Sequence, residues 1–360
     1  MKEKSLNVNQ ICAFLLAVIP LTKLITAPAV FAGYCNEQLW QPLVILALFD
    51  ILLIFIFVFT IKKHNNRTFF DILSDSYSPN FAKTVFFIYA IFFICKSIIP
   101  LIEQKELIEN AFYETLPQVP AFFPLFLVIF YICLRGLKTF GRLSQACLFI
   151  SLSGILLILF LSFSTAEFKY ILPLHKLPTK SVAICSLNAL SWFNDAIYLF
   201  FFMGHFEQEK KQNLKIFLSY VSAFFILLVY FIIFYCIFTF IAPTQKIALN
   251  SMSIFGVTIV NVGRFDYIAL FLLSMSSIVA VSTPLVLATH CFKKVFESEN
   301  NLIFAIISSV IPFIITLFFA SKYESVLSFC TQYLTPLYLI CGYVLPFFAL
   351  GGKKRDLQTR

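Results

Sequence analysis

Charged residues are scarce in this sequence. Asp, Glu, Lys and Arg make up only 12% of the 360 residues, whereas 60% are hydrophobic. A soluble globular domain carries about 25% charged residues, so this shortage excludes that class of protein. A chain this long and this apolar is typical of a membrane protein that crosses the bilayer many times.

Signatures of catalysis and of metal binding are also missing. The sequence contains no G-x-x-x-x-G-K-[ST] loop, no H-E-x-x-H pair and no nucleophile elbow, so nothing in it supports an ATPase, a protease or a hydrolase. Its four histidines lack ligand spacing, and its ten cysteines are scattered singly without a C-x-x-C pair. We therefore expect a protein that is not an enzyme and that holds no metal ion and no cofactor.

Apolar stretches suited to crossing a bilayer recur along the chain, and the basic residues between them predict their direction. Of the 27 Lys and Arg residues, 18 fall on the side of the amino terminus and 7 on the other side. Because cytoplasmic loops are enriched in Lys and Arg, we expect both termini and the loops near Lys62, Lys138, Lys211 and Lys293 in the cytoplasm. The ten stretches cover residues 8–32, 41–62, 82–102, 120–134, 143–165, 181–204, 214–241, 265–291, 302–320 and 328–350.

The first stretch is interrupted by Pro20, Lys23 and Pro28. Proline removes a backbone donor and clashes with the preceding turn, so carbonyl groups near Lys23 lose their helical partners at a depth where lipid cannot replace them. Such backbone is tolerated only where it faces protein or a cavity, and we expect a broken helix there. The alternative is a kinked packing helix whose Lys23 extends to the interface.

The sixth stretch gathers polar residues within a short distance. Ser191, Asn194 and Asp195 either share a helix face or mark an unwound segment, and such a cluster serves either helix packing or a binding site. Lys23 and Asp195 both lie about halfway along their stretches, so we predict that they form an ion pair. Asp50 in the second stretch competes for the same cation: it is expected to pair with Lys23 or Lys96, to be protonated, or to lie nearer the interface.

Interrupted helices at positions one and six predict an internal repeat. Five helices per repeat is an odd number, so the second copy is inverted and the two broken helices meet near the midplane. We therefore expect an all-α membrane protein with ten transmembrane helices in a 5+5 inverted repeat. The single domain would span residues 1–360, with repeats at about 8–165 and 181–350.

One polar pocket near the midplane is expected between the first, third, sixth and eighth stretches. The helix-breaking residues are Pro20 and Pro28, and hydroxyl groups in the eighth stretch either line the pocket or satisfy one another. The predicted pocket residues are Lys23, Thr26, Lys96, Ser191, Asn194, Asp195, Ser277 and Thr283.

Two segments outside the stretches are expected on the outer surface. Residues 101–116 read as an amphipathic extension whose acidic residues Glu103, Glu106, Glu109 and Glu114 face water. Residues 254–262 are too short to span a membrane and read as a surface or interfacial helix.

Four sequence segments, taken together, resemble one known family. These are LTKLITAPAVFAGYCNEQLWQP at 21–42, FGRLSQ at 140–145, MGHFEQEK at 203–210 and VGRFDYIALF at 262–271. In order and spacing they are similar to the B subunits of spore germination receptors, the spore permease family of the amino acid, polyamine and organocation transporter superfamily. Leu21, Thr22 and Lys23 stand where that family commonly has small glycines.

The resemblance implies a germinant-sensing, transporter-like subunit that binds a small molecule such as an amino acid. It also implies two protein partners, an A-type membrane subunit and a C-type lipoprotein, in a bacterial cell membrane or spore inner membrane. Nucleic acid is not an expected partner. Two other functions stay open: an autonomous secondary transporter of amino acids or amines, and a structural scaffold without a ligand.

Overall fold

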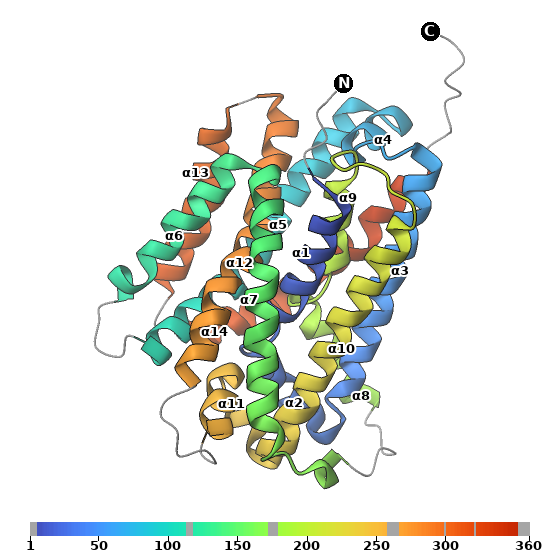
Figure 1. Ribbon diagram of the computed structural model, residues 1–360. Helices are drawn as coiled ribbons and strands as arrows, with labels where there is room; N and C mark the ends of the chain where they lie inside the picture. Colours follow the sequence, from blue (N-terminus) through green and yellow to red (C-terminus); the bar gives the residue numbers. More distant parts are fainter. Residues whose placement is uncertain are drawn as a thin grey trace.

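The computed structural model describes residues 6–112, 118–171, 179–257, 266–298, 300–319 and 322–351. These residues form helices joined by short links, and the part of the chain described contains no strand, only an isolated backbone bridge between Leu6 and Phe206. The long helices run side by side in one bundle (Figure 1). The predicted all-α class is confirmed.

The ten predicted stretches fall on helices in the predicted order. The first comprises α1 (Val8–Leu21) and α2 (Ala27–Cys35), and the sixth comprises α8 (Thr179–Asn188) and α9 (Tyr198–Phe202). The others correspond to α3 (Trp40–His64), α5 (Pro79–Phe112), α6 (Gln118–Arg135), α7 (Leu137–Phe163), α10 (Gln212–Phe238), α12 (Asp266–Phe296), α13 (Asn301–Phe318) and a chain of short helices from α14 (Tyr323–Ser328) onward.

Length and apolar composition single out six of these helices as able to cross a membrane, or seven if the bent final segment counts as one span. The six are α3, α5, α7, α10, α12 and α13. Three predicted stretches fall below that threshold. Two of them, α1 with α2 and α8 with α9, consist of shorter pieces, and the third, α6, counts only from Phe122 to Arg135 as a shorter apolar helix. Two of these three are the stretches that the sequence predicts to be interrupted.

The bundle is arranged around α1. This short helix packs against α7, α10 and α12, and α12 in turn packs along α5. Helices α6 and α13 form a pair on one side, against α5 and α12. The first and last described segments lie near α9 and α4 (Phe69–Ser76), since the backbone N–H of Leu6 donates to the carbonyl of His205 and the hydroxyl of Tyr77 donates to that of Phe348. Figure 1 shows α2, α8, α11 (Ala248–Val257) and α14 at the opposite end of the molecule from α4 and α9.

The final segment is the least regular part of the bundle. Beyond α14 it consists of the π-helical turn η7 (Phe329–Tyr333), α15 (Thr335–Leu339), the π-helical turn η8 (Ile340–Val344) and the 3₁₀ segment η9 (Leu345–Leu350). Its two halves are bent by 52°. Single π turns inside helices are frequent at functional sites.

The structure corrects two predictions about the outer surface. Helix α5 continues without interruption to Phe112, and Glu103 is fully buried, so this part of the segment is neither a separate amphipathic helix nor a water-exposed acidic face. Glu114 lies outside the described residues. The predicted short helix at 254–262 is instead α11, which ends at Val257, and residues 258–262 also lie outside the described part.

Helix α4 was not predicted, because its eight residues are too few to stand out in a window of membrane-spanning length. It follows two left-handed residues, Asn65 and Asn66, at the end of α3. Thr68 caps its start by accepting a hydrogen bond from the backbone N–H of Asp71 at 3.2 Å. The amide of Asn66 is tied to the carbonyl of Phe206, which joins this corner to the segment after α9.

Candidate functional site

The first helix breaks where its prolines predict. Helix α1 ends at Leu21, directly after Pro20, and α2 begins at Ala27 with Pro28 in its first turn, where a missing N–H leaves no bond unmade. Thr22 to Thr26 are not helical and are buried. The prediction of a broken first helix is therefore confirmed.

The backbone groups in this break find partners inside the protein. The carbonyl of Ile19 accepts hydrogen bonds from the hydroxyl of Thr22 at 3.2 Å and the ammonium of Lys23 at 3.0 Å. The hydroxyl of Tyr230 donates to the carbonyl of Leu24 at 3.1 Å. The backbone N–H of Ala248 donates to the carbonyl of Ile25 at 2.7 Å, which ties the break to the start of α11. No lipid has to satisfy these groups.

The sixth helix is broken between Asn188 and Tyr198. Two 3₁₀ turns, η3 (Ala189–Ser191) and η4 (Asp195–Ile197), replace the helix there. Asn194 has a left-handed backbone with φ of 68°, a conformation that asparagine tolerates better than most residues. The polar cluster therefore marks an unwound segment and not a continuous helix face.

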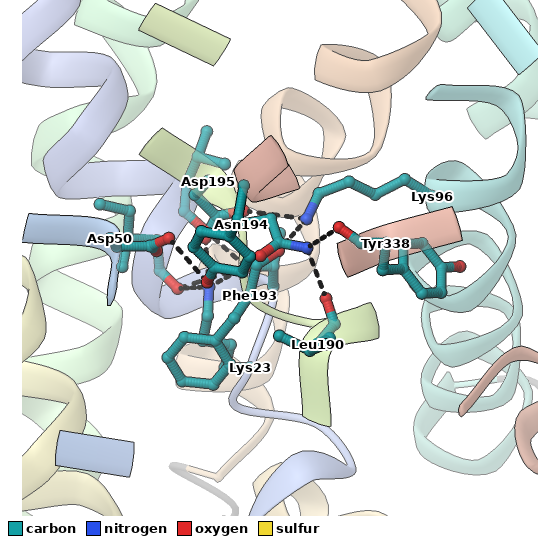
Figure 2. A network of polar contacts seen from close by, with 12 residues as sticks. Lys23, Asp50, Lys96, Leu190, Phe193, Asn194, Asp195 and Tyr338 are labelled. Atoms are coloured by element: carbon teal, nitrogen blue, oxygen red, sulfur yellow. Dashed lines mark hydrogen bonds and ion pairs between the residues drawn. The ribbon is translucent and has the colours of Figure 1, made fainter. Parts of the chain in front are cut away.

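The Asn194 side chain holds this unwound segment against the final span. Its amide donates hydrogen bonds to the carbonyls of Leu190 at 3.3 Å and Tyr338 at 3.0 Å (Figure 2). Gly342 makes room for it, since a Cβ atom at Gly342 would lie 2.6 Å from the Asn194 amide group. Ser191, by contrast, donates to the carbonyl of Asn188 in its own segment.

Lys23 and Asp195 form the predicted ion pair between the two breaks. The Lys23 ammonium is fully buried and donates hydrogen bonds to the Asp195 carboxylate, to the carbonyl of Ile19 and to the hydroxyl of Thr22. Its three N–H donors are thus all used. It also lies 4.9 Å from the centre of the Phe193 ring. The alternative in which Lys23 extends to the interface is wrong.

Lys96 reaches the same carboxylate from α5. Its ammonium donates to the backbone carbonyl of Phe193 and lies 3.6 Å from the second oxygen of Asp195 (Figure 2). Lys96 therefore caps a carbonyl that the broken helix leaves free, and it shares Asp195 with Lys23. Two cations from two helices meet one anion at the break of the sixth stretch.

Asp50 completes this group without the predicted direct pairing. It accepts hydrogen bonds from the hydroxyls of Tyr220 at 3.1 Å and Tyr343 at 3.3 Å, and the two lysines act on it from a longer distance. The expectation that Asp50 pairs directly with Lys23 or Lys96 is wrong, because Asp195 lies closer to both lysines. We call Lys23, Asp50, Lys96, Asn194 and Asp195 the central cluster.

A second polar group lies beside the central cluster. Glu103 of α5 accepts hydrogen bonds from the hydroxyl of Thr26 and from the indole of Trp192, the latter at 2.9 Å. Sequence reasoning missed Glu103 and Trp192. The available signal was spacing, since Glu103 follows Lys96 by two helical turns and so lies on the same face of α5.

The hydroxyl groups of α12 bond mainly to backbone carbonyls of their own helix and to Gln104, not to one another, and the buried hydroxyl of Ser274 has no hydrogen-bond partner within the described residues. Ser277 donates to the side chain of Gln104 at 2.6 Å and to the carbonyl of Ser274 at 2.7 Å. Thr283 donates to the carbonyl of Val279, one turn back in its own helix. Seven of the eight predicted residues thus fall into the central cluster, the Thr26–Glu103 group and the hydroxyls of α12, whereas Ser191 bonds only within its own segment among the described residues. Their role in ligand binding stays a prediction.

Comparison with known proteins identifies the family. Residues 6–324 match the family described as spore germination protein, the spore permease family. The chain belongs to this family. The match covers most of the sequence, including both broken helices and the central cluster, and it confirms the family resemblance of the sequence segments. No curated protein matches the chain.

Solved structures of transporters share the fold. A Na⁺-coupled sialic acid symporter in a substrate-bound, outward-open state superposes with a TM-score of 0.63 at 9% identity, covering 95% of this chain and 80% of that one. The nucleobase-cation-symport-1 family transporter MHP1, in a closed conformation with bromovinylhydantoin bound, superposes with a TM-score of 0.59 at 13% identity. The match covers 94% of this chain and 78% of that one.

A manganese transporter of Eremococcus coleocola, in complex with an aromatic bis-isothiourea compound, superposes with a TM-score of 0.56 at 12% identity. The match covers 98% of this chain and 81% of that one. At these identities the likeness shows a common fold and no more. This chain is a multi-pass membrane protein of the spore germination family with a transporter-like architecture.

Proposed function

We propose that this protein is the germinant-sensing, transporter-like membrane subunit of a spore germination receptor, and that it binds a small molecule such as an amino acid. One observation carries the proposal: the breaks of the first and sixth helices meet at buried ionisable side chains from four elements. Charged groups inside membrane spans are costly and usually serve a binding site or a pathway.

The chemistry of the central cluster supports a zwitterionic ligand. Two lysines and two carboxylates lie together, and Asn194 adds a polar amide. The ammonium and carboxylate groups of an amino acid offer each member of the Lys23–Asp195 pair a replacement partner. Such an exchange would separate the two broken helices without leaving either charge unpaired.

The proposal includes topology and partners. We place both termini in the cytoplasm and the protein in a spore inner membrane, beside an A-type membrane subunit and a C-type lipoprotein. Helices α1 to α7 and α8 to the final span would be inverted repeats within one domain. The first and last described segments lie at one end of the bundle, since Leu6 bonds to His205, and Lys63, near the end of α3, bonds to Leu350; this arrangement supports the proposed topology.

Reconstitution tests the function. The full chain in nanodiscs should bind at least one member of a panel of radiolabelled amino acids, and Asp195→Asn should weaken that binding at least tenfold. Proteoliposomes containing this chain alone should show no uptake of the bound amino acid. Uptake would favour an autonomous transporter, whereas absence of binding together with co-purification of both partners would favour a scaffold.

A further inference from the structure

A second candidate site lies beside α2, at the end of the molecule opposite α4 and α9 (Figure 1). A cavity of about 340 Å³ opens there between α2, the link that follows η5 (Thr239–Thr244), and α14. Most of its wall is apolar. It is lined by Thr26, Ala29, Val30, Gly33, Tyr34, Pro243, Lys246, Tyr323, Glu324 and Leu327.

The charges at the mouth of the cavity are already matched. Lys246 and Glu324 form an ion pair across it, and both side chains are largely exposed to solvent. Because exposed pairs contribute little and exchange readily with water, this pair neutralises the mouth without closing it. Any unmatched charge that attracts a ligand must therefore lie deeper.

Such a charge lies directly behind the cavity wall. Thr26 lines the cavity and donates its hydroxyl to Oε1 of Glu103. Glu103 is fully buried, its Oε2 atom has no hydrogen-bond partner, and Lys23 acts on it only from a distance. Within the described residues, Glu103 belongs to no ion pair.

This arrangement is unfavourable unless a further group completes it. A carboxylate buried without a cation is strongly unfavourable and otherwise takes up a proton, and a buried acceptor without a donor is unfavourable as well. We propose that the cavity is a binding site for a small organic ammonium ion whose N–H groups bond to Glu103 after the Thr26 hydroxyl turns aside.

The rest of the cavity suits the remainder of such a ligand. Ala29, Val30 and Leu327 provide an apolar wall for a short hydrocarbon chain. Tyr323 also lines the cavity, and its buried hydroxyl, near Thr26 and Glu103, can accept a hydrogen bond from the ammonium. No residue of the central cluster lines this cavity, although Lys23 acts electrostatically on Glu103 from a distance.

Trp192 makes the site observable. The protein has two tryptophans, and the indole of Trp192 donates a hydrogen bond to Glu103 at 2.9 Å. In a Trp40→Phe background, Trp192 fluorescence therefore reports on Glu103. We expect n-butylammonium chloride to change this fluorescence saturably in the full chain in nanodiscs, whereas butan-1-ol, its uncharged analogue, should require at least tenfold higher concentration.

Two substitutions on α5 distinguish the effect of removing the Glu103 charge from the effect of removing another acidic charge on the same helix. Glu103→Gln keeps the shape of the side chain but removes its charge, and it should weaken n-butylammonium binding at least tenfold without changing the butan-1-ol response. Glu109→Gln is the matched control, because Glu109 lies on the same helix and is paired with Lys105 at 2.7 Å. It should leave both responses unchanged.

Filling the cavity provides an independent test that keeps Glu103. A Cβ atom on Gly33 would contact only Pro243, at 3.8 Å, so a larger side chain there extends into the cavity without a backbone clash. Gly33→Leu should abolish n-butylammonium binding. This variant tests the proposed site even if Glu103→Gln does not fold. Equal binding of n-butylammonium and butan-1-ol, or unchanged n-butylammonium binding in Glu103→Gln or Gly33→Leu, would overturn the proposal.

Discussion

Asp195 is the anionic partner of two lysines, so its substitution should destabilise the fold more than substitution of either lysine does. Lys23→Met leaves Asp195 with Lys96, whereas Asp195→Asn leaves two buried ammonium groups without their anion. Breaking a buried ion pair on one side typically costs about 3 to 5 kcal/mol. We expect Asp195→Asn to lower the melting temperature of the purified protein more than Lys23→Met does, and the double variant to lose less than the sum of the two.

Asp50→Asn is the control for this cycle. Its partners Tyr220 and Tyr343 can bond to an amide as well as to a carboxylate, so its coupling to Lys23→Met should be weaker than that of Asp195→Asn. Losses that simply add for Lys23 and Asp195 would show that the two residues are independent.

The contact between Gly342 and Asn194 gives a second prediction. A Cβ atom at Gly342 would lie 2.6 Å from the Asn194 amide, and overpacking of this kind costs about 1 to 3 kcal/mol. Gly342→Ala should therefore lower the melting temperature, yet have little further effect in an Asn194→Ala background. Gly33→Ala is the matched control and should be tolerated. An equal loss from Gly342→Ala in both backgrounds would contradict the contact.

Sequence reasoning at this scale identified charges but not all of their partners. Lys23, Asp50, Lys96 and Asp195 stand out because charges are rare in apolar stretches, and depth along the stretch was enough to favour Lys23 with Asp195. The sequence could not predict that two tyrosine hydroxyls donate hydrogen bonds to Asp50. Glu103 was assigned to water because neighbouring acidic residues made its surroundings polar in sequence, although in space Thr26 and Trp192 cover it.

The break in the first helix depends on partners from other elements. The Tyr230 hydroxyl of α10 satisfies the Leu24 carbonyl at 3.1 Å, and both groups are buried. Tyr230→Phe leaves that carbonyl without a donor, at about 1 to 3 kcal/mol. We expect a lower melting temperature and faster hydrogen exchange at the backbone N–H of Ala248, whose bond to Ile25 holds the same break.

Tyr131→Phe serves as the comparison, since Tyr131 is exposed on α6 and, within the described residues, its hydroxyl accepts a hydrogen bond only from Arg135 of the same helix. It should be close to neutral. If Tyr230→Phe is equally neutral, the hydroxyl does not stabilise the break.

Elements with strong hydrophobic periods were predictable, and elements defined by their neighbours were not. The positions of Pro20 and Pro28 located the first break because proline acts locally. The length of α5 was underestimated, since burial of Glu103 and Lys105 depends on packing that no sequence window contains. The 3₁₀ and π turns of the final span left no recognisable signal either.

Topology is testable on the whole molecule. Lys169 and Lys210 are exposed and lie near opposite ends of α10. The backbone N–H of Glu167 donates to the carbonyl of Cys236 close to the end of this helix, whereas Lys210 precedes its first residue, Gln212. In a background without the ten native cysteines, a cysteine at position 169 should react with an impermeant reagent in intact cells. One at position 210 should react only after permeabilisation, and the reverse pattern would invert the orientation.

The order of the ten segments was predictable from hydropathy, because a bilayer imposes the same length on every span. The family match and the transporter fold agree with that order. The meeting of the two breaks was expected from their positions in the two halves. The individual contacts at this meeting point could not be predicted, because Asn194 lies far in the sequence from its neighbours Tyr338 and Gly342.

The final span has a structural consequence for the molecule. Its five pieces contain five or six residues each, so it lacks the uninterrupted ladder of bonds that makes a long helix stiff. Glu324 at its start lines the cavity, and Tyr338 and Tyr343 further along contact Asn194 and Asp50. The final span therefore links the cavity to the central cluster through a series of short helical pieces, so the two polar regions share one interrupted element.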